Sequence, residues 1–135
     1  FSDRPAIILR ACLKLQQDDP QAIFSRIADL SVRRRESQPL DMPSAGSTFK
    51  RPEGHFAGKL ISDCGLKGCR IGDVQVSEKH AGFIVNLGLG CAADTRSLIE
   101  KIKREVAEKT GVRLEPEVRF VGDWQEWGQE GPAKE

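Results

Sequence analysis

The sequence predicts an α+β fold in which a small, mainly antiparallel sheet packs against helices. Two observations predict it: short apolar runs with the two-residue period of strands, and longer segments whose apolar residues recur at helical spacing. The order of these elements along 135 residues favours α+β, and the chain is long enough for a domain with its own core. A composition of 39% hydrophobic and 30% charged residues is typical of a soluble globular protein.

The first expected element is a strand over residues 5–15, where apolar residues alternate with arginine, cysteine and lysine. Asp19 followed by Pro20 is typical of a helix start, with a capping side chain and a proline at the first helical position. This helix is expected to run to about Arg35, because arginines in the last turn suit the helix dipole. Residues 37–54 contain prolines, glycines and little periodicity, and we expect an ordered loop there.

A short helix is expected over residues 56–64, closed by Gly65, with Phe56, Leu60 and Cys64 on its inner face. Gly58 inside this helix costs about 1 kcal/mol relative to alanine. A close approach of the backbone to a neighbour or a ligand would explain why a glycine stands there.

Two strands are expected over residues 72–76 and 81–87, followed by a helix that Asp94 caps and that stops at Gly111. Its buried stripe is Leu98, Ile99, Ile102 and Val106. Its exposed ion pairs are Glu100–Arg104, Lys101–Glu105 and Glu105–Lys109. A closing strand over residues 112–121, interrupted by Pro116, precedes a tail from Asp123 that we expect to be frayed.

Charge and cysteine content narrow the functional classes. The net charge of +1 gives no global attraction to nucleic acid or membrane, and no apolar run approaches the roughly 20 residues of a membrane span. Cysteines at 12, 64, 69 and 91 form no CxxC pair and the two histidines are far apart, so we expect no zinc site. We expect reduced, mostly buried thiols in a cytoplasmic protein. The chain starts at Phe1, and we expect it to be a piece of something longer.

Two stretches carry the functional signal: Pro43–Gly54, a loop of small residues that presents a serine, and Leu114–Gly122, which presents a carboxylate. Taken alone, such a serine is usually a turn residue and such a glutamate is usually solvated. On a regular strand, Val118 and Phe120 would face the core, and Glu117 and Arg119 would face a cleft on the other side.

In their order and spacing these stretches resemble the C-terminal domain of the UDP-N-acetylenolpyruvoylglucosamine reductase (MurB) family. Further stretches that resemble it are Arg33–Leu40, Ala57–Ile61, Gly65–Gly68, Gly72–Ser77 and His80–Asn86. The resemblance implies three parts. Residues 1–37 would be the terminal strand and helix of the FAD-binding portion, residues 38–122 the substrate-binding domain, and residues 123–135 a tail.

The resemblance also implies an activity. This family reduces UDP-N-acetylglucosamine enolpyruvate to UDP-N-acetylmuramate in peptidoglycan synthesis. NADPH reduces FAD, a hydride goes from the flavin to C3, and a proton goes to C2. The family's proton donor falls on Ser47 and its glutamate falls on Glu117. A serine hydroxyl is a weak acid, so the site must stabilise its conjugate base or relay a proton to it. Glu117 could stay protonated in a low-dielectric cleft beside the substrate carboxylate.

Substrate contacts are expected at Gly46, Arg51, Lys59 and His80. Arg51 stands where many relatives carry an asparagine that touches the substrate. Lys59 either touches the nucleotide diphosphate or is solvated. His80 is either a substrate contact or a satisfied structural histidine, and the sequence leaves this open.

The resemblance places the glycine-rich flavin-binding regions before this domain. Gly88-Leu89-Gly90 is not a dinucleotide fingerprint, because it lacks the following glycine and the βαβ frame. We therefore expect no cofactor-binding residue in this chain, no turnover from it alone, and a partner in its own N-terminal FAD-binding domain.

Two other functions are compatible with the sequence. The chain could be a UDP-sugar-binding module without reductase activity. It could also bind nucleic acid or a protein partner through the arginines at positions 33–35, but tyrosine is absent and the phenylalanines stand mostly at core positions. The reductase domain is the function that the motifs favour.

Overall fold

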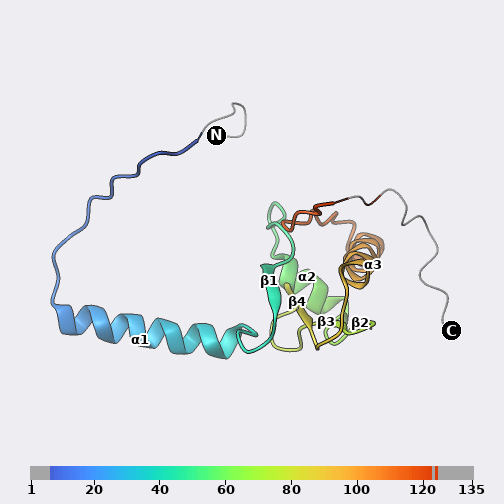
Figure 1. The fold of residues 1–135 in the computed structure, drawn as a ribbon, viewed down its shortest axis with the longest axis horizontal. Coiled ribbons are helices and arrows are strands. Elements are labelled where there is room, and N and C mark those ends of the chain that lie inside the picture. Colours follow the sequence, from blue (N-terminus) through green and yellow to red (C-terminus); the bar gives the residue numbers. More distant parts are fainter. Residues whose placement is uncertain (1–6, 123, 125–135) are drawn as a thin grey trace. The chain divides into compact units, whose positions relative to one another are not determined.

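The computed structural model describes residues 7–122 and residue 124 (Figure 1). The chain divides into two compact units, Phe1–Arg33 and Arg34–Glu135. No helix among the described residues is long and apolar enough to cross a membrane.

The helix α1 spans Pro20–Ser37 and begins where the sequence predicts. A carboxylate oxygen of Asp19 accepts the N–H of Ala22 at 3.0 Å, and the Asp19 carbonyl accepts the N–H of Ile23 at 3.0 Å. These bonds satisfy donors of the first turn that have no partner within the helix. Arg34 and Arg35 lie in the last turn, as expected from the dipole.

The strand expected over residues 5–15 is wrong for the part that the structure describes. Residues 7–19 lie outside any helix or strand, and Leu9 and Leu13 are 91% and 79% exposed. The alternation of side chains predicts which face a strand would bury, but a strand also needs a neighbouring strand to pair with its backbone N–H and C=O groups. Residues 5 and 6 lie outside the described residues.

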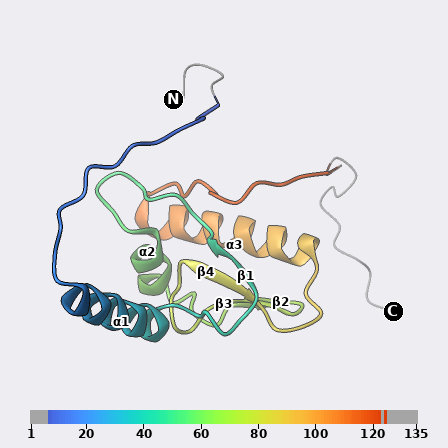
Figure 2. The same cartoon turned by 60° about the vertical axis from the view of Figure 1, so that its left-hand side comes forward.

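A four-stranded antiparallel sheet forms the centre of the second unit, with the strand order β1-β4-β3-β2. Figure 2 shows α3 running along this sheet with α2 beside it. The predicted α+β class is thereby confirmed. The element bounds are Ser44–Ser47 for β1, Ala57–Asp63 for α2, Arg70–Ile71 for β2, Val74–Val76 for β3, Phe83–Asn86 for β4 and Ala92–Thr110 for α3.

Two strand predictions for this unit need correction. The segment expected to be a loop contains β1, an edge strand of small residues that pairs with β4 despite its low strand propensity. The closing strand expected over residues 112–121 is reduced to one isolated bridge between Phe49 and Pro116. Proline has no N–H to donate, so a regular ladder cannot continue through it.

The hydrophobic core lies between the sheet and the helices α2 and α3. The buried stripe predicted for α3 is confirmed, since Leu98, Ile99, Ile102 and Val106 are all fully buried. The inner face predicted for α2 is right in part: Leu60 and Cys64 pack against the core, but its fully buried residues are Ala57 and Ile61, and Phe56 is 60% exposed. Phe56 is the N-cap with extended backbone angles, so its side chain does not continue the helical face.

Helix α3 begins earlier in the sequence than predicted. Cys91 is the N-cap and Asp94 stands at the third helical position, where the two form a reciprocal capping box. Gly111 ends the helix in the left-handed conformation, as predicted. Of the three expected ion pairs, those of Glu105 with Lys101 and Lys109 are present, whereas Glu100 pairs with Lys103.

The cysteines are free thiols, but the expectation that most are buried is wrong. Cys12 and Cys91 are exposed, and Cys64 and Cys69 are half-buried.

Candidate functional site

A β-bulge sets the position of the candidate serine. Ser44 pairs with Val85 and Ser47 with Phe83. Between these two pairs β1 advances by three residues, whereas β4 advances by two. Gly46 lies inside this irregularity with φ of +83°, a conformation that side chains other than glycine rarely adopt. The extra residue re-aims the end of the strand, and Ser47 follows it directly.

Thr48 ties the serine loop to two other segments. Its N–H donates to the Gly82 carbonyl at 2.8 Å, and its carbonyl accepts the N–H of Glu117 at 2.9 Å. The bridge between Phe49 and Pro116 and the ion pair of Lys50 with Glu115 join the same two segments, the serine loop and the segment around Pro116. These contacts therefore hold Glu117 beside the loop that carries Ser47, although 70 positions separate the two residues in sequence.

One open cleft of about 440 Å³ gathers most of the residues that the sequence singles out. We call it the serine cleft. The polar and charged side chains that line it are Ser47, Arg51, Lys59, Ser62, Lys67, Lys79, His80 and Glu117. Gly46 is not among the lining residues, and the structure gives it the backbone role described above.

The serine cleft is cationic. Arg51, Lys59, Lys67 and Lys79 face a single lining carboxylate, Glu117. The guanidinium of Arg51 lies 4.0 Å from the centroid of the Phe56 ring, which holds it by a cation–π contact. An excess of positive charge in a concave site favours anionic ligands such as carboxylates and diphosphates.

His80 is held at the wall of the serine cleft. Its Nδ1 accepts the N–H of Gly82 at 3.1 Å, and its ring meets Phe83 edge-on at a centroid distance of 5.0 Å. Because Nδ1 accepts, the neutral ring carries its proton on Nε2 and has one donor left.

The expected close approach at Gly58 is confirmed, since a Cβ built there would lie 3.2 Å from the Gly82 nitrogen.

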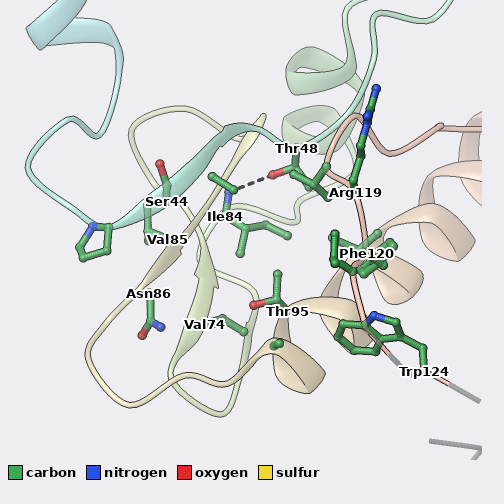
Figure 3. Close-up of a pocket in the computed structure, with 16 residues that line it drawn as sticks. Ser44, Thr48, Val74, Ile84, Val85, Asn86, Thr95, Arg119, Phe120 and Trp124 are labelled. Carbon is green, nitrogen blue, oxygen red and sulfur yellow. Dashed lines mark hydrogen bonds between the residues drawn. The ribbon is translucent and has the colours of Figure 1, made fainter. Parts of the chain in front are cut away.

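A second, more apolar pocket of about 550 Å³ lies between the sheet, α3 and the C-terminal segment (Figure 3). Figure 3 shows Phe120 and Trp124 along one side of it and Ile84 and Val85 along the other. Arg119 belongs to the lining of this pocket, whereas Glu117 lines the serine cleft. The expectation that both side chains face one cleft is therefore wrong, because the segment is not a regular strand.

The loop before α3 does not offer a phosphate cradle. The Asn86 side-chain oxygen accepts the N–H groups of Gly88 at 2.9 Å and Gly90 at 3.0 Å. The next amides are also taken, with Leu89 donating to Asp73 and Cys91 to Asp94. Amides that already bond to the chain's own oxygens are not free to bind the phosphates of a dinucleotide. Among residues 7–122 and 124, no cluster of three or more His, Cys, Asp or Glu could hold a metal ion.

Four residues of the site carry no functional signal of their own in the sequence. Three of them, Ser62, Lys67 and Lys79, line the serine cleft; Lys67 lies within the family-like stretch Gly65–Gly68, and Lys79 stands between two such stretches. Lys79 also donates to the Arg35 carbonyl at 2.6 Å. The fourth is Thr48, because nothing in the sequence marks which residue of the loop joins it to other segments.

Comparison with known proteins decides the family. Residues 38–121 match the family model of UDP-N-acetylenolpyruvoylglucosamine reductase, C-terminal domain. The chain belongs to this family. The resemblance inferred from the motifs is thereby confirmed.

Curated relatives of this reductase family extend the match. The UDP-N-acetylenolpyruvoylglucosamine reductase of Clostridium novyi (strain NT) is 55% identical over 117 residues, which are 87% of this chain and 38% of that protein. The one from Caldanaerobacter subterraneus subsp. tengcongensis is 53% identical over 123 residues, or 91% of this chain and 41% of that protein. The chain thus spans about two fifths of the length of these relatives.

A solved structure shares the fold. The crystal structure of UDP-N-acetylenolpyruvylglucosamine reductase (MurB) from Thermus caldophilus matches with a TM-score of 0.64 and 40% sequence identity. The match covers 78% of this chain and 37% of that chain.

Proposed function

We propose that this chain is the substrate-binding, proton-donating C-terminal domain of an oxidoreductase of peptidoglycan synthesis. The reductase would convert UDP-N-acetylglucosamine enolpyruvate to UDP-N-acetylmuramate in the cytoplasm, with FAD and NADPH. One observation carries the proposal: Ser47 and Glu117 line the same cationic cleft and are joined through Thr48. Family membership supports the same activity.

Ser47 is the proposed proton donor. Addition of a hydride at C3 of the enolpyruvyl group leaves an electron pair at C2 that the adjacent carboxylate shares. Transfer of the Ser47 hydroxyl proton to C2 forms the C2–H bond and leaves an alkoxide to be reprotonated. The hydroxyl now donates to the Phe49 carbonyl at 3.3 Å, a long bond that costs little to exchange for substrate. Cationic side chains of the cleft would stabilise the alkoxide.

Glu117 is proposed to act on the substrate at the same end. Its backbone is fixed by the bond to Thr48, while its side chain is exposed at the cleft. A carboxyl group beside the substrate carboxylate must be protonated to donate a hydrogen bond. The water that reaches Glu117 in this chain would be excluded when substrate fills the cleft.

The remaining charges suit the nucleotide end of the substrate. Lys59 pairs with Asp63 at 2.8 Å on the exposed face of α2, and both side chains are more than half exposed. Such a pair contributes little to stability, so Lys59 can turn to a diphosphate at small cost. Arg51 and His80 are proposed to contact polar groups of the sugar or the diphosphate, Arg51 through its planar guanidinium and His80 through Nε2–H. Gly46 would contribute through its backbone.

The loop before α3 is not proposed to hold the phosphates of FAD. The loop amides before α3 are occupied, and no residue among 7–122 and 124 is proposed to bind the flavin. FAD and NADPH are assigned to a separate FAD-binding portion, and this chain alone is expected to show no turnover.

Residues 1–37 are proposed to belong with that FAD-binding portion. The match to the Clostridium novyi relative covers more residues than lie between position 38 and the chain end, so it reaches into this segment. The apolar side chains of residues 7–15 are exposed in this chain, and those of residues 9–15 alternate as a sheet partner would require. Residues 38–122 are the proposed substrate-binding domain and residues 123–135 its tail.

An NMR titration of this chain with UDP-N-acetylglucosamine enolpyruvate, without FAD, tests the proposal. We expect amide shifts clustered at Ser47, Lys59, His80 and Glu117. UDP-N-acetylglucosamine, which lacks the enolpyruvyl group, should shift Lys59 but leave Ser47 and Glu117 nearly unchanged. Identical shifts from both compounds would contradict the reductase role and favour a plain UDP-sugar-binding module.

A matched pair of variants checks the charge assignment. Lys59→Met should weaken binding of the UDP-sugar roughly tenfold, the usual effect of losing one charge-assisted bond. Lys103→Met is the control, because Lys103 pairs with Glu100 on α3 and does not line the serine cleft. Equal losses in both variants would mean that only the overall charge matters.

A further inference from the structure

A tight turn brings the side chains of Arg51 and Phe56 together in the serine cleft. The Pro52 carbonyl accepts the His55 N–H at 3.1 Å, and Gly54 within this turn has φ of +69°. Across the turn, the guanidinium carbon of Arg51 lies 4.0 Å from the centre of the Phe56 ring. Both residues line the serine cleft, so this contact lies in the site itself.

The backbone on each side of the turn is fixed, but the Arg51 side chain is not. The Lys50 N–H donates to the Glu115 carbonyl at 2.9 Å, and the Phe56 carbonyl accepts the Leu60 N–H at 3.1 Å at the start of α2. Within the described part of the chain, the Arg51 guanidinium makes no ion pair. An arginine side chain has many rotamers, so the contact with the ring is what restricts it.

Phe56 stands where another type of residue would stabilise the helix better. It is the N-cap of α2, its side chain makes no capping hydrogen bond, and 60% of the residue is exposed. Serine, threonine, aspartate or asparagine at an N-cap accepts an N–H of the first turn. The position therefore forgoes a cap and leaves an aromatic ring in water. Departures from a local rule of this kind are expected at functional sites, and the contact with Arg51 supplies the reason.

We propose that Phe56 is a positioning residue for Arg51. A guanidinium held against a ring still has N–H donors along its edge, and these can bind two oxygens of a phosphate or a carboxylate at once. The ring orders Arg51 before a ligand arrives, which lowers the entropy cost of ordering it on binding. The identity of the ligand rests on the proposed function, whereas the ordering of Arg51 does not.

The NMR spectrum of the 135-residue chain tests the contact itself. The ring current of Phe56 should move the Hδ protons of Arg51 upfield in the wild type. Phe56→Leu removes the ring and should return these protons to their usual position, and Phe56→Tyr should keep them upfield. Unshifted Arg51 protons in the wild type would overturn the proposal without any variant.

Calorimetry with UDP and with UDP-N-acetylglucosamine enolpyruvate tests the positioning. Phe56→Leu should weaken binding roughly two- to tenfold, the usual effect of ordering one long side chain on association. Phe56→Tyr should bind within about twofold of the wild type, because the aromatic face remains. In an Arg51→Met background, Phe56→Leu should have no further effect. A loss of the same size with and without Arg51 would show that the ring does not act through the guanidinium.

A pair of cap variants separates positioning from helix stability. Phe56→Ser and Phe56→Ala both lose the ring, and only the serine can cap α2. The serine variant should therefore melt at a higher temperature than the alanine variant. Both should bind equally weakly, because neither orders Arg51. Tighter binding by the serine variant would mean that Phe56 affects the cleft only through the stability of α2, and the proposal would be wrong.

Phe120 provides a matched control for the loss of an arginine–phenylalanine contact. The guanidinium carbon of Arg96 lies 5.9 Å from the centre of the Phe120 ring, and Phe120 lines the apolar pocket rather than the serine cleft. Phe120→Leu should leave the binding of both compounds unchanged. A loss equal to that of Phe56→Leu would reject a specific role for Phe56.

The two ligands identify the anion and separate this inference from the proposed function. If Phe56→Leu weakens both compounds equally, Arg51 binds the diphosphate. If it weakens only the enolpyruvyl compound, Arg51 binds the carboxylate. If both compounds bind the wild type equally well and depend on Phe56, the reductase role fails and the inference stands. If Phe56→Leu binds both as the wild type does, the inference fails and the proposed function stands. If neither compound binds the wild type, both fail.

Discussion

The ring of His80 occupies the space that a side chain at position 58 would need. A Cβ built on Gly58 lies 3.2 Å from His80 Cε1, and a Cβ built on Gly82 lies 3.0 Å from the same atom. The imidazole is therefore packed between two glycines, one on α2 and one at the start of β4. This packing, together with the bond from the Gly82 N–H to Nδ1, fixes which nitrogen of His80 can donate within the serine cleft.

Gly58→Ala should destabilise the chain although alanine is the better helix former. The gain in helix propensity is about 1 kcal/mol, but the new methyl group must displace His80 or the Gly82 backbone, and overpacking costs about 1–3 kcal/mol. We expect a lower melting temperature and a changed NMR shift of the His80 Cε1 proton. A double-mutant cycle with His80→Ala checks the cause. An equal cost of Gly58→Ala with and without the histidine would show that the ring is not the obstacle.

Gly46→Ala should strain the bulge and move Ser47. No heavy atom lies within 4 Å of the added Cβ, so the cost comes from the φ of +83° and is about 1 kcal/mol. Gly54→Ala is the matched control, with φ of +69° and equally open space. Both variants should lose similar stability in urea unfolding, but only Gly46→Ala should shift the Ser47 and Phe83 amides. Unchanged amides at Ser47 would mean that the bulge does not set the serine.

Ser47→Ala should remove the proposed proton donor and leave substrate binding nearly intact. In the reductase that combines this domain with its FAD-binding portion, we expect kcat to fall about 10²–10⁴-fold with little change in KM. Ser44→Ala is the control on the same strand, since Ser44 lines the apolar pocket. Steady-state NADPH oxidation with the enolpyruvyl substrate measures both. A Ser47→Ala enzyme with normal kcat would assign the proton to another group.

The sequence predicted the helices of this fold better than its strands, for a physical reason. The stripe of α3 and the cap at Asp19 are local signals, because helical hydrogen bonds join residues four positions apart. The pairing of β1 with β4 and the bulge depend on residues far away in the sequence, and the small residues of β1 carry no strand signal. The alternation in residues 9–15 is present, but the described structure contains no partner strand for it.

The same contrast between local signals and long-range contacts applies to the candidate site. Ser47 and Glu117 were found through resemblance to a family, and the structure adds that both line one cleft. The link between them could not be predicted, because it runs through the backbone carbonyl of Thr48, and a backbone group has no residue type to recognise. The placement of Arg119 was missed for a related reason. One bridge at Pro116 does not impose the two-residue alternation of a ladder.

Cys91→Ser should stabilise the chain by improving the N-cap of α3. The Cys91 sulfur accepts the Asp94 N–H at 3.4 Å, and the Asp94 carboxylate accepts the Cys91 N–H at 3.2 Å. Sulfur is a weak acceptor, whereas serine is among the preferred N-cap residues, so we expect a gain of about 0.5–1 kcal/mol in the free energy of unfolding.

Urea unfolding of Cys91→Ser measures that gain, with Cys12→Ser as the control because Cys12 is also exposed but lies outside any helix. Alkylation of Cys91 should have the opposite effect, since a bulky thioether cannot approach the Asp94 N–H. Asp94→Ala should cost about 1 kcal/mol, because it removes the other half of the box and a carboxylate from the positive end of the helix dipole. A serine variant less stable than the wild type would mean that the thiol contributes through packing, and that the cap is secondary.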